Sequence, residues 1–400
     1  MKYIDESFTP AEGLERAVKL LKQRNFEASV LPRDLSAEGL GEEKTLDLLA
    51  FHVLGRASAL DHPLTFAHMD PPTPWITWAT SLWNSRLNQN LLHPSISPFA
   101  SEAETKVMSW ITPFFGMNGG HMCSGSTVAN LTALWAARDV RKVTKIVASE
   151  YAHLSIQKSA QILGLPFECI KTDEGGRIDR RSLGDMTDAA LVLTAGTTAA
   201  GTIDPLDLVG HAGWSHIDAA WSGPLRMTQE YSHLLDGIEM ADSVAVSAHK
   251  WFYQPKDSAL IMFRNPQDCD HTLSLSSDYL AKPNTGLQGS RGAAAIPLLA
   301  TLLAWGSNGI AERICRSMRH AKSFAGKIDE DDRLILWAEP KTGIVLFRPK
   351  FLSVDDFQQR LPENMFSTCK VDGQDWLRAV AVNPILDVEG VILEINKALS

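Results

Sequence analysis

Short apolar segments alternate with helical patterns through the middle of this 400-residue chain, and this alternation limits the fold more than any other feature. Apolar runs at 146–148 and 191–193 and the alternating residues Val244 and Val246 have the pattern of buried strands. Strands separated by helices predict an α/β fold whose mainly parallel sheet carries helices on both faces. Sites in such sheets form at the carboxyl ends of the strands, so the residues there are the first candidates for function.

One of these strands ends in His249-Lys250-Trp251. Lys250 follows small and apolar residues and is flanked by two aromatic rings, so partial desolvation should lower its pKa from the usual value of about 10.4. A neutral amine attacks an aldehyde, and Lys250 is therefore a candidate to form a Schiff base. The alternative is a lysine that merely ends a strand, and it would be preferred if nothing else in the chain supported an aldehyde.

Two further segments support an aldehyde that carries a phosphate and a pyridine ring. Asp218 ends a short strand, and a buried carboxylate needs a cation such as a protonated pyridine nitrogen. Gly125, Ser126 and Thr127 stand at the start of a predicted helix, where free backbone amides can hold a phosphate. Together with Lys250, these residues predict a site for pyridoxal 5'-phosphate (PLP), in which the positive ring acts as an electron sink.

The chain resembles the group II PLP-dependent amino acid decarboxylases, the branch of fold type I that includes glutamate, aromatic amino acid and diaminobutyrate decarboxylases. The matching motifs are S-G-S-T-V-A-N from Ser124, A-H-L-S around His153, T-A-G-T-T-A-A-G from Thr194, H-I-D-A-A-W around Asp218 and D-S-V-A-V-S-A-H-K-W from Asp242. Each motif is weak alone, but their order and spacing make the set specific.

The resemblance implies roles for these residues. Lys250 would carry the cofactor, Asp218 would pair with the ring nitrogen, and His153 would stack on the ring face. The resemblance also implies a site whose other cofactor contacts are Thr194, Ala220, Ser247, His249 and, from the second subunit of a homodimer, Ser290.

The expected architecture has three parts: a helical arm at 1–75, a large PLP-binding domain at 76–280 and a small C-terminal α+β domain at 281–400. In the resembling family the arm wraps around a partner subunit. The alternative is that its helices pack on their own chain.

The proline-rich segment 62–74 is expected to border the substrate pocket, so Phe66, His68 and Met69 are candidates to contact the amino acid side chain. Arg378 could bind a substrate carboxylate with its planar fork of donors, or it could form a structural salt bridge. The histidines of this segment could equally be ordinary turn or core residues. No metal is expected, because the pairs His62/His68 and His121/Cys123 lack further ligands at the usual spacing.

The chain departs from the family in one segment that matters for the reaction. The family's decarboxylases carry a longer mobile loop before Gly289, and its tyrosine returns a proton to the carbanion. Here the segment is short and Tyr279 is the last tyrosine, so His153, His68 and Lys250 are the candidate proton donors.

Decarboxylation of an L-amino acid to its amine is the expected reaction. The alternatives are another PLP-dependent carbanion reaction, namely carbon–carbon or carbon–sulfur cleavage, transamination or an aldehyde-forming oxidative decarboxylation, or a non-catalytic PLP-binding subunit.

Composition excludes several other classes of protein. A net charge of −9 argues against nucleic acid and anionic membranes as partners. Five scattered cysteines favour a reducing cytoplasm, and residues 1–6 show no basic start of a secretory signal. The apolar run 293–305 is interrupted by Pro297 and predicts a buried helix.

Overall fold

The computed structural model describes residues 12–23 and 25–400, and the chain divides into two compact units after Ala59. In the first unit, helices α1 (Glu12–Leu20) and α2 (Glu42–Val53) are joined by an ion pair in which Arg16 Nη2 lies 2.6 Å from Asp47 Oδ1. The acidic start at residues 1–6 lies outside the described residues.

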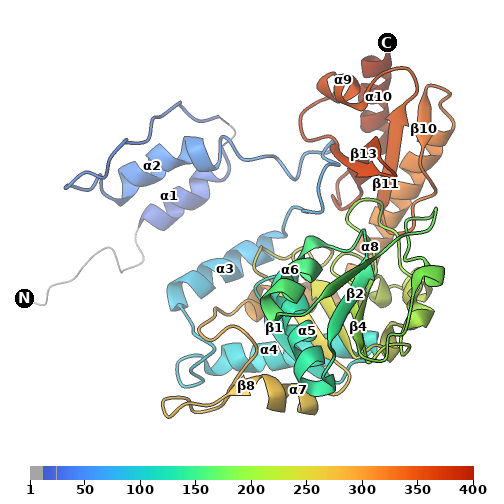
Figure 1. The fold of residues 1–400 in the computed structure, drawn as a ribbon. Coiled ribbons are helices and arrows are strands. Elements are labelled where there is room, and N and C mark those ends of the chain that lie inside the picture. Colours follow the sequence, from blue (N-terminus) through green and yellow to red (C-terminus); the bar gives the residue numbers. More distant parts are fainter. Residues whose placement is uncertain (1–11, 24) are drawn as a thin grey trace, which may run out of the picture. The chain divides into compact units, whose positions relative to one another are not determined.

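A seven-stranded sheet forms the centre of the second unit (Figure 1). The strand order is β1-β7-β6-β5-β4-β2-β3, and β2 to β6 run parallel while β7 is antiparallel to both of its neighbours. The predicted mainly parallel sheet is therefore confirmed. The strands are β1 (Gly119–Cys123), β2 (Lys145–Ser149), β3 (Phe167–Ile170), β4 (Ala189–Thr194), β5 (Trp214–Asp218), β6 (Ser243–Ser247) and β7 (Ala259–Phe263).

Each face of this sheet packs into its own hydrophobic core. Successive side chains of a strand point to opposite faces, so Val244 and Val246 enter one core while Ala245 enters the other. The helices around the sheet are α3 (Trp75–Leu87), α4 (Pro98–Ile111), α5 (Ser126–Arg141), α6 (Leu154–Leu163) and α7 (Pro266–Leu273). Alanines of α5 at 129, 133, 136 and 137 are fully buried, which lets this helix lie close against the sheet.

The remaining elements of this domain are short. A hairpin is formed by β8 (Ser274–Leu275) and β9 (Asn284–Thr285). Single 3₁₀ turns occur at η2 (Thr112–Phe115), η3 (Arg180–Ser182), η4 (Leu206–Leu208), η5 (Gly223–Met227), η6 (Ser232–Leu235) and η7 (Ile238–Met240).

A long helix, α8 (Ala295–Asp329), links the large sheet to the C-terminal domain (Figure 1). Its first part, which contains the buried Leu298 and Leu302, is the buried helix expected from the apolar run. Pro297 is tolerated because it stands in the first turn, where backbone N–H groups lack helical partners. Gly306 interrupts the helix with a positive φ of 62°, which glycine adopts at little cost.

The C-terminal domain is built on a four-stranded antiparallel sheet with the order β10-β11-β13-β12. Its elements are β10 (Leu334–Leu336), β11 (Ile344–Pro349), α9 (Val354–Gln359), β12 (Ser367–Val371), β13 (Gln374–Val380) and α10 (Val388–Leu399). In the described part of the chain, no helix combines the length and apolar character that crossing a membrane requires.

Phe66 lies in the core of this C-terminal domain. Its backbone N–H donates to Met365 O at 3.1 Å, its carbonyl accepts from Val380 N at 2.7 Å, and its ring centroid lies 5.0 Å from that of Phe324. The side chain is fully buried, and a contact of Phe66 with the substrate stays a prediction. The segment around it packs with the C-terminal domain, although the sequence analysis grouped it with the N-terminal arm.

Candidate active site

Lys250 lies three residues beyond β6, in the turn that leads to the segment before β7. Burial lowers the pKa of its amine, although the carboxylates of Asp218 and Asp70 oppose this effect. The direction predicted from the sequence is therefore confirmed. The ion pair with Asp70 is made by the neighbouring Lys256 and not by Lys250.

Asp218 ends β5 and is only 4% exposed. Its Oδ2 accepts a hydrogen bond from Asn130 Nδ2 at 2.9 Å, and its Oδ1 accepts one from the backbone N–H of Ala220 at 3.1 Å. None of the ion pairs among the described residues includes it. A buried carboxylate that has only neutral donors would be stabilised by a cation such as a pyridinium nitrogen.

His153 is the N-cap residue of α6, in the turn that follows β2. Its Nδ1 accepts a hydrogen bond from the backbone N–H of Ser155 at 3.2 Å and lies 2.8 Å from Ser155 Oγ. Burial lowers the pKa of the imidazole, so the neutral ring is favoured. A neutral, half-buried ring held at a helix start is suited to stack on another planar ring.

The predicted phosphate loop begins the sixteen-residue helix α5, with Gly125 as its N-cap. A Cβ atom added at Gly125 would meet no atom within 4 Å, so there is open space beside the loop. The backbone amides of Ser126 and Thr127 lie in the first turn, where helices leave donors for an anion.

Buried hydroxyl groups stand at the carboxyl ends of three of the parallel strands. Thr194 ends β4, Ser247 ends β6 and Ser149 ends β2, and none of these hydroxyls has a hydrogen-bond partner among the described residues. An unsatisfied buried hydroxyl costs about 1–3 kcal/mol, so a bound polar ligand would stabilise this edge of the sheet. Ser149 was missed by the sequence analysis, although its position before Tyr151 and His153 places it at the predicted edge.

His249 and Ala220 line the same region through backbone contacts. His249 Nδ1 donates to the carbonyl of Ser258 at 3.1 Å, because a carbonyl can only accept. Burial lowers the pKa of His249 to about 4, and its ring is therefore neutral near pH 7. Ala220 contributes the N–H that holds Asp218 and a carbonyl that accepts from Ser247 N at 3.3 Å.

Arg378, on β13, is a guanidinium without a carboxylate partner among the described residues. Its Nη1 donates to Thr198 O at 2.7 Å and its Nε to Ser367 Oγ at 3.0 Å. Burial lowers its pKa, and its charge also acts on Lys250. These contacts orient the side chain, and the charge of Asp70 acts on the guanidinium without forming an ion pair among the described residues.

The other two candidate substrate contacts differ in exposure. His68 is exposed, whereas Met69 is buried in the hydrophobic core that includes the large sheet. The residue after them, Asp70, forms an ion pair with Lys256. Neither His68 nor Met69 is placed against Lys250 by a described contact.

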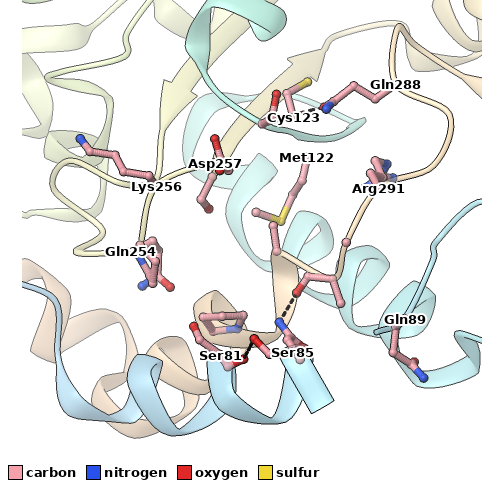
Figure 2. A pocket seen from close by; sticks show the side chains of 18 of the residues that line it. Ser81, Ser85, Gln89, Met122, Cys123, Gln254, Lys256, Asp257, Gln288 and Arg291 are labelled. Atoms are coloured by element: carbon pink, nitrogen blue, oxygen red, sulfur yellow. Dashed lines mark hydrogen bonds between the residues drawn. The ribbon is translucent and has the colours of Figure 1, made fainter. Parts of the chain in front are cut away.

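A cavity of about 560 Å³ adjoins the phosphate loop (Figure 2). Gln288, which lines it, accepts a hydrogen bond from Ser124 N at 3.0 Å. Arg291 lies at its side and forms an ion pair with Glu104, with 2.6 Å between Nη2 and Oε1. Ser290 is exposed here and accepts from Asn90 Nδ2 at 3.1 Å, and its contact with a cofactor in a second subunit stays a prediction.

Tyr279 lies in the segment 276–283 between β8 and β9. Its side chain is 68% exposed, and its ring centroid lies 6.4 Å from that of His93. No described contact joins it to Lys250 or Asp218.

Three buried residues around Asp218 were not among the predicted site residues. Asn130 forms hydrogen bonds with Asp218, Ser155 and His216, so it connects the other two to the carboxylate. Asn130 is the last residue of the S-G-S-T-V-A-N motif. His216 precedes Asp218 by two residues, so His216 and Asp218 lie on the same face of β5.

These residues fit PLP. The buried carboxylate of Asp218 suits the ring nitrogen, and the open loop at Gly125 suits the phosphate. The hydroxyls of Thr194 and Ser247, which lack partners among the described residues, suit the polar substituents of the ring. The amine of Lys250, whose pKa is lowered by burial, suits the aldehyde. Where PLP is bound, it serves as an electron sink for the bond that is broken.

Comparison with known proteins agrees with this chemistry. The family model described as the pyridoxal-dependent decarboxylase conserved domain matches residues 55–350. The chain is 30% identical to an L-2,4-diaminobutyrate decarboxylase of Rhizobium meliloti (strain 1021), over 86% of this chain and 79% of that protein. It is 28% identical to an aspartate 1-decarboxylase of Aliivibrio fischeri, over 82% and 70% of the two chains.

Solved structures share the fold. The glutamate decarboxylase domain of a diaminobutyrate-pyruvate transaminase and L-2,4-diaminobutyrate decarboxylase from Vibrio parahaemolyticus superposes with a TM-score of 0.81 at 24% identity, covering 97% of this chain and 94% of that one. An Oryza sativa TDC with PLP and tryptamine gives a TM-score of 0.86 at 19% identity, covering 99% and 98%. The match of the family model over most of the chain, on residues that fit the cofactor, shows that this protein belongs to the PLP-dependent amino acid decarboxylases.

Proposed function

We propose that Lys250 carries the PLP with which this enzyme converts an L-amino acid to the corresponding amine and carbon dioxide. The observation that supports this most directly is that the buried amine of Lys250 lies within the electrostatic influence of Asp218. Asp218 is a buried carboxylate without a cationic partner among the described residues. The two groups match the two ends of the cofactor that must be held during the reaction.

Each side chain then has a separate task. Lys250 supplies a neutral amine, because burial disfavours its charged form. Asp218 holds a proton on the ring nitrogen, and the N–H of Ala220 and the amide of Asn130 keep its two oxygens in place. His153 covers the ring face and excludes water from it, and Gly125, Ser126 and Thr127 hold the phosphate.

The proton that replaces the carboxylate must come from a group near Lys250. Of the three candidates, His68 is exposed. Burial lowers the pKa of both His153 and Lys250, and the charge of Asp218 acts on both groups in the opposite direction. We therefore assign the return of the proton to His153 or Lys250. Tyr279 is an exposed residue of a short segment and is not assigned this role.

The substrate is proposed to be an amino acid with a short charged side chain. The relatives named above include decarboxylases of L-2,4-diaminobutyrate and aspartate. Arg378, whose charge acts on Lys250 and which forms no ion pair among the described residues, supports the binding of a substrate carboxylate near Lys250.

The test is to incubate the PLP-loaded protein with L-2,4-diaminobutyrate, L-aspartate, L-glutamate and L-tyrosine and to analyse gas and products by mass spectrometry. Carbon dioxide in equal amount with the matching amine is expected for one of the first three. A keto acid, an aldehyde or a side-chain fragment without the amine would contradict the proposed reaction.

Arg378→Lys should raise the KM for the substrate about 10- to 100-fold, because a lysine keeps the charge but loses the bidentate fork that binds a carboxylate. The matched control is Arg348→Lys, which changes an arginine on the neighbouring strand β11 that lies over the Trp376 ring. Steady-state kinetics together with thermal unfolding separate a role of Arg378 in substrate binding from a role in the stability of the fold. Equal KM values for both variants would show that Arg378 is only structural.

We also infer that the protein is a homodimer that uses helix α3 in its interface. This helix buries Thr77 and Thr80, whereas its tryptophans Trp75, Trp78 and Trp83 are 70%, 55% and 62% exposed. Surface helices ordinarily bury their apolar face. A helix that exposes its tryptophans and buries its threonines therefore indicates a surface that is covered by another protein surface.

Trp83→Glu should convert the dimer to a monomer, since a charge in an apolar interface must be desolvated on association. Ile162→Glu, which changes an exposed apolar residue of α6, is the control and should stay dimeric. Sedimentation equilibrium measures both masses. A monomeric wild-type protein, or a dimeric Trp83→Glu variant, would contradict the assignment of α3.

A reducing compartment such as the cytoplasm is proposed as its location. All five cysteines are free within the described residues, and Cys123 and Cys269 are buried. Burial raises the pKa of both thiols to about 12, which keeps them protonated and unreactive.

A further inference from the structure

Three buried side chains follow one another along one face of β5. Trp214, His216 and Asp218 are spaced by two residues, so they form a row on the same side of the sheet. Asn130 of α5 and Ser243 of β6 connect the members of this row. The function proposed above uses only Asp218, and the rest of the row needs an explanation.

The direction of the hydrogen bonds can be derived from the Asp218 end. A carboxylate only accepts, so Asn130 must present its NH₂ group to Asp218, with 2.9 Å between Nδ2 and Oδ2. The amide oxygen of Asn130 then faces His216 Nε2 at 3.0 Å. Because an amide oxygen cannot donate, the ring proton of His216 must be on Nε2, and its Nδ1 must accept from Ser243 Oγ at 2.9 Å.

The opposite end of the row leads to the same direction. An indole N–H only donates, so Trp214 Nε1 donates to Ser243 Oγ at 2.9 Å. The hydroxyl proton of Ser243 is then available for His216 Nδ1. Burial lowers the pKa of His216 to about 4, so the ring is neutral near pH 7, as this arrangement requires. Every polar hydrogen along the row therefore has an acceptor.

Asn130 also connects the row to His153. Its second N–H donates to Ser155 Oγ at 3.0 Å, and that oxygen lies 2.8 Å from His153 Nδ1. The backbone N–H of Ser155, which can only donate, points to the same nitrogen at 3.2 Å. His153 Nδ1 is therefore an acceptor, and the neutral ring carries its proton on Nε2.

We propose that Asn130 is a positioning residue whose single amide group holds both Asp218 and, through Ser155, His153, and that His216 fixes the direction of this amide. The inference rests on the proposed function, in which Asp218 would contact the ring nitrogen of PLP and His153 its ring face. The Asn130 amide thus uses its oxygen and both hydrogens to hold Asp218 and His153 in fixed positions relative to each other.

The test compares Asn130→Leu with Thr132→Val, a control on the same helix whose buried hydroxyl bonds to Val128 O at 2.8 Å, outside the row. Asn130→Leu should lower kcat about 10- to 100-fold and weaken PLP binding, with a smaller change in KM, because Asp218 loses a donor to a charged group. Thr132→Val should change kcat by less than about threefold.

A second measurement does not depend on activity. In PLP-free protein labelled with ¹⁵N-histidine, the signal of His216, assigned with a His216→Gln variant, should show the proton on Nε2. In Asn130→Leu the proton should move to Nδ1, since Nε2 loses its acceptor. A proton on Nδ1 in the wild type, or a wild-type kcat in Asn130→Leu, would overturn the proposal.

If Asn130→Leu fails to fold, Ser243→Ala gives the answer from the other end of the row. This variant removes the donor to His216 Nδ1 but leaves the Asn130 oxygen as the acceptor for Nε2, so the His216 proton should stay on Nε2 while kcat falls about 2- to 10-fold. A proton on Nδ1 in this variant, or an unchanged kcat, would overturn the proposal. Should the wild type release no carbon dioxide from any amino acid, the proposed function fails while the histidine signals still test the row.

Discussion

Lys250→Ala should abolish the visible absorbance of lysine-bound PLP and reduce amine formation to background. The amine of Lys250 is buried and has a lowered pKa, which are the properties of an amine that reacts with an aldehyde. An absorbance spectrum of the purified variant after addition of PLP, followed by gel filtration, measures the first effect. The product assay measures the second.

The control for this experiment is Lys256→Ala. Lys256 is the next lysine in the chain, but its amine forms an ion pair with Asp70 and is largely exposed. This variant should retain the absorbance of bound PLP. A yellow Lys250→Ala protein, or a colourless Lys256→Ala protein, would contradict the assignment of Lys250.

Asp218→Asn should leave the protein folded but lower kcat at least about 100-fold. Removing one charge of a buried ion pair costs about 3–5 kcal/mol, and here the ring nitrogen of PLP would lose the carboxylate that keeps it protonated. The new amide would also face the NH₂ group of Asn130, which now donates to Asp218 Oδ2. Stopped-flow kinetics and thermal unfolding separate loss of turnover from loss of structure.

Asp204→Asn is the matched control, because Asp204 is also buried at the carboxyl edge of the large sheet. Its oxygens accept backbone N–H groups of Thr194 and Ile178 at 2.8 and 2.7 Å, and burial raises its pKa to about 6. This substitution should lower the unfolding temperature and leave kcat within a few-fold of wild type. Comparable losses of kcat in both variants would remove the argument that Asp218 acts on the ring nitrogen.

The sequence predicts the large sheet and the chemistry at its edge because both depend on local patterns. Apolar strands that alternate with helices indicate parallel pairing, and the polar residues that follow them mark the carboxyl edge. Lys250, Asp218 and His153 each stand at the end of such a strand or in the turn after it. The supporting residues Asn130 and His216 are harder to find, because their function is visible only once α5 lies against β5.

Other positions depend on contacts between distant segments and could not be read from local patterns. The segment 62–74 has the composition of a loop that lines a site, yet Phe66 is a core residue of the C-terminal sheet. In α3 the tryptophans are exposed while Thr77 and Thr80 are buried, an arrangement that local sequence does not reveal. The hydrogen-bond partners of Phe66 lie near the other end of the chain, and a second subunit is proposed as the partner of the α3 tryptophans.

The position of Phe66 has a consequence for the order of folding. Phe66 completes the C-terminal core, but the ribosome adds it about 300 residues before its partners Met365 and Val380 (365 and 66 differ by 299). Closing so long a loop is entropically costly unless the intervening domain has already folded and shortened it. On the ribosome the large sheet should therefore form first, with Phe66 solvent-exposed until the last strands emerge. A chaperone that binds exposed aromatic residues would have this segment as a target throughout that interval.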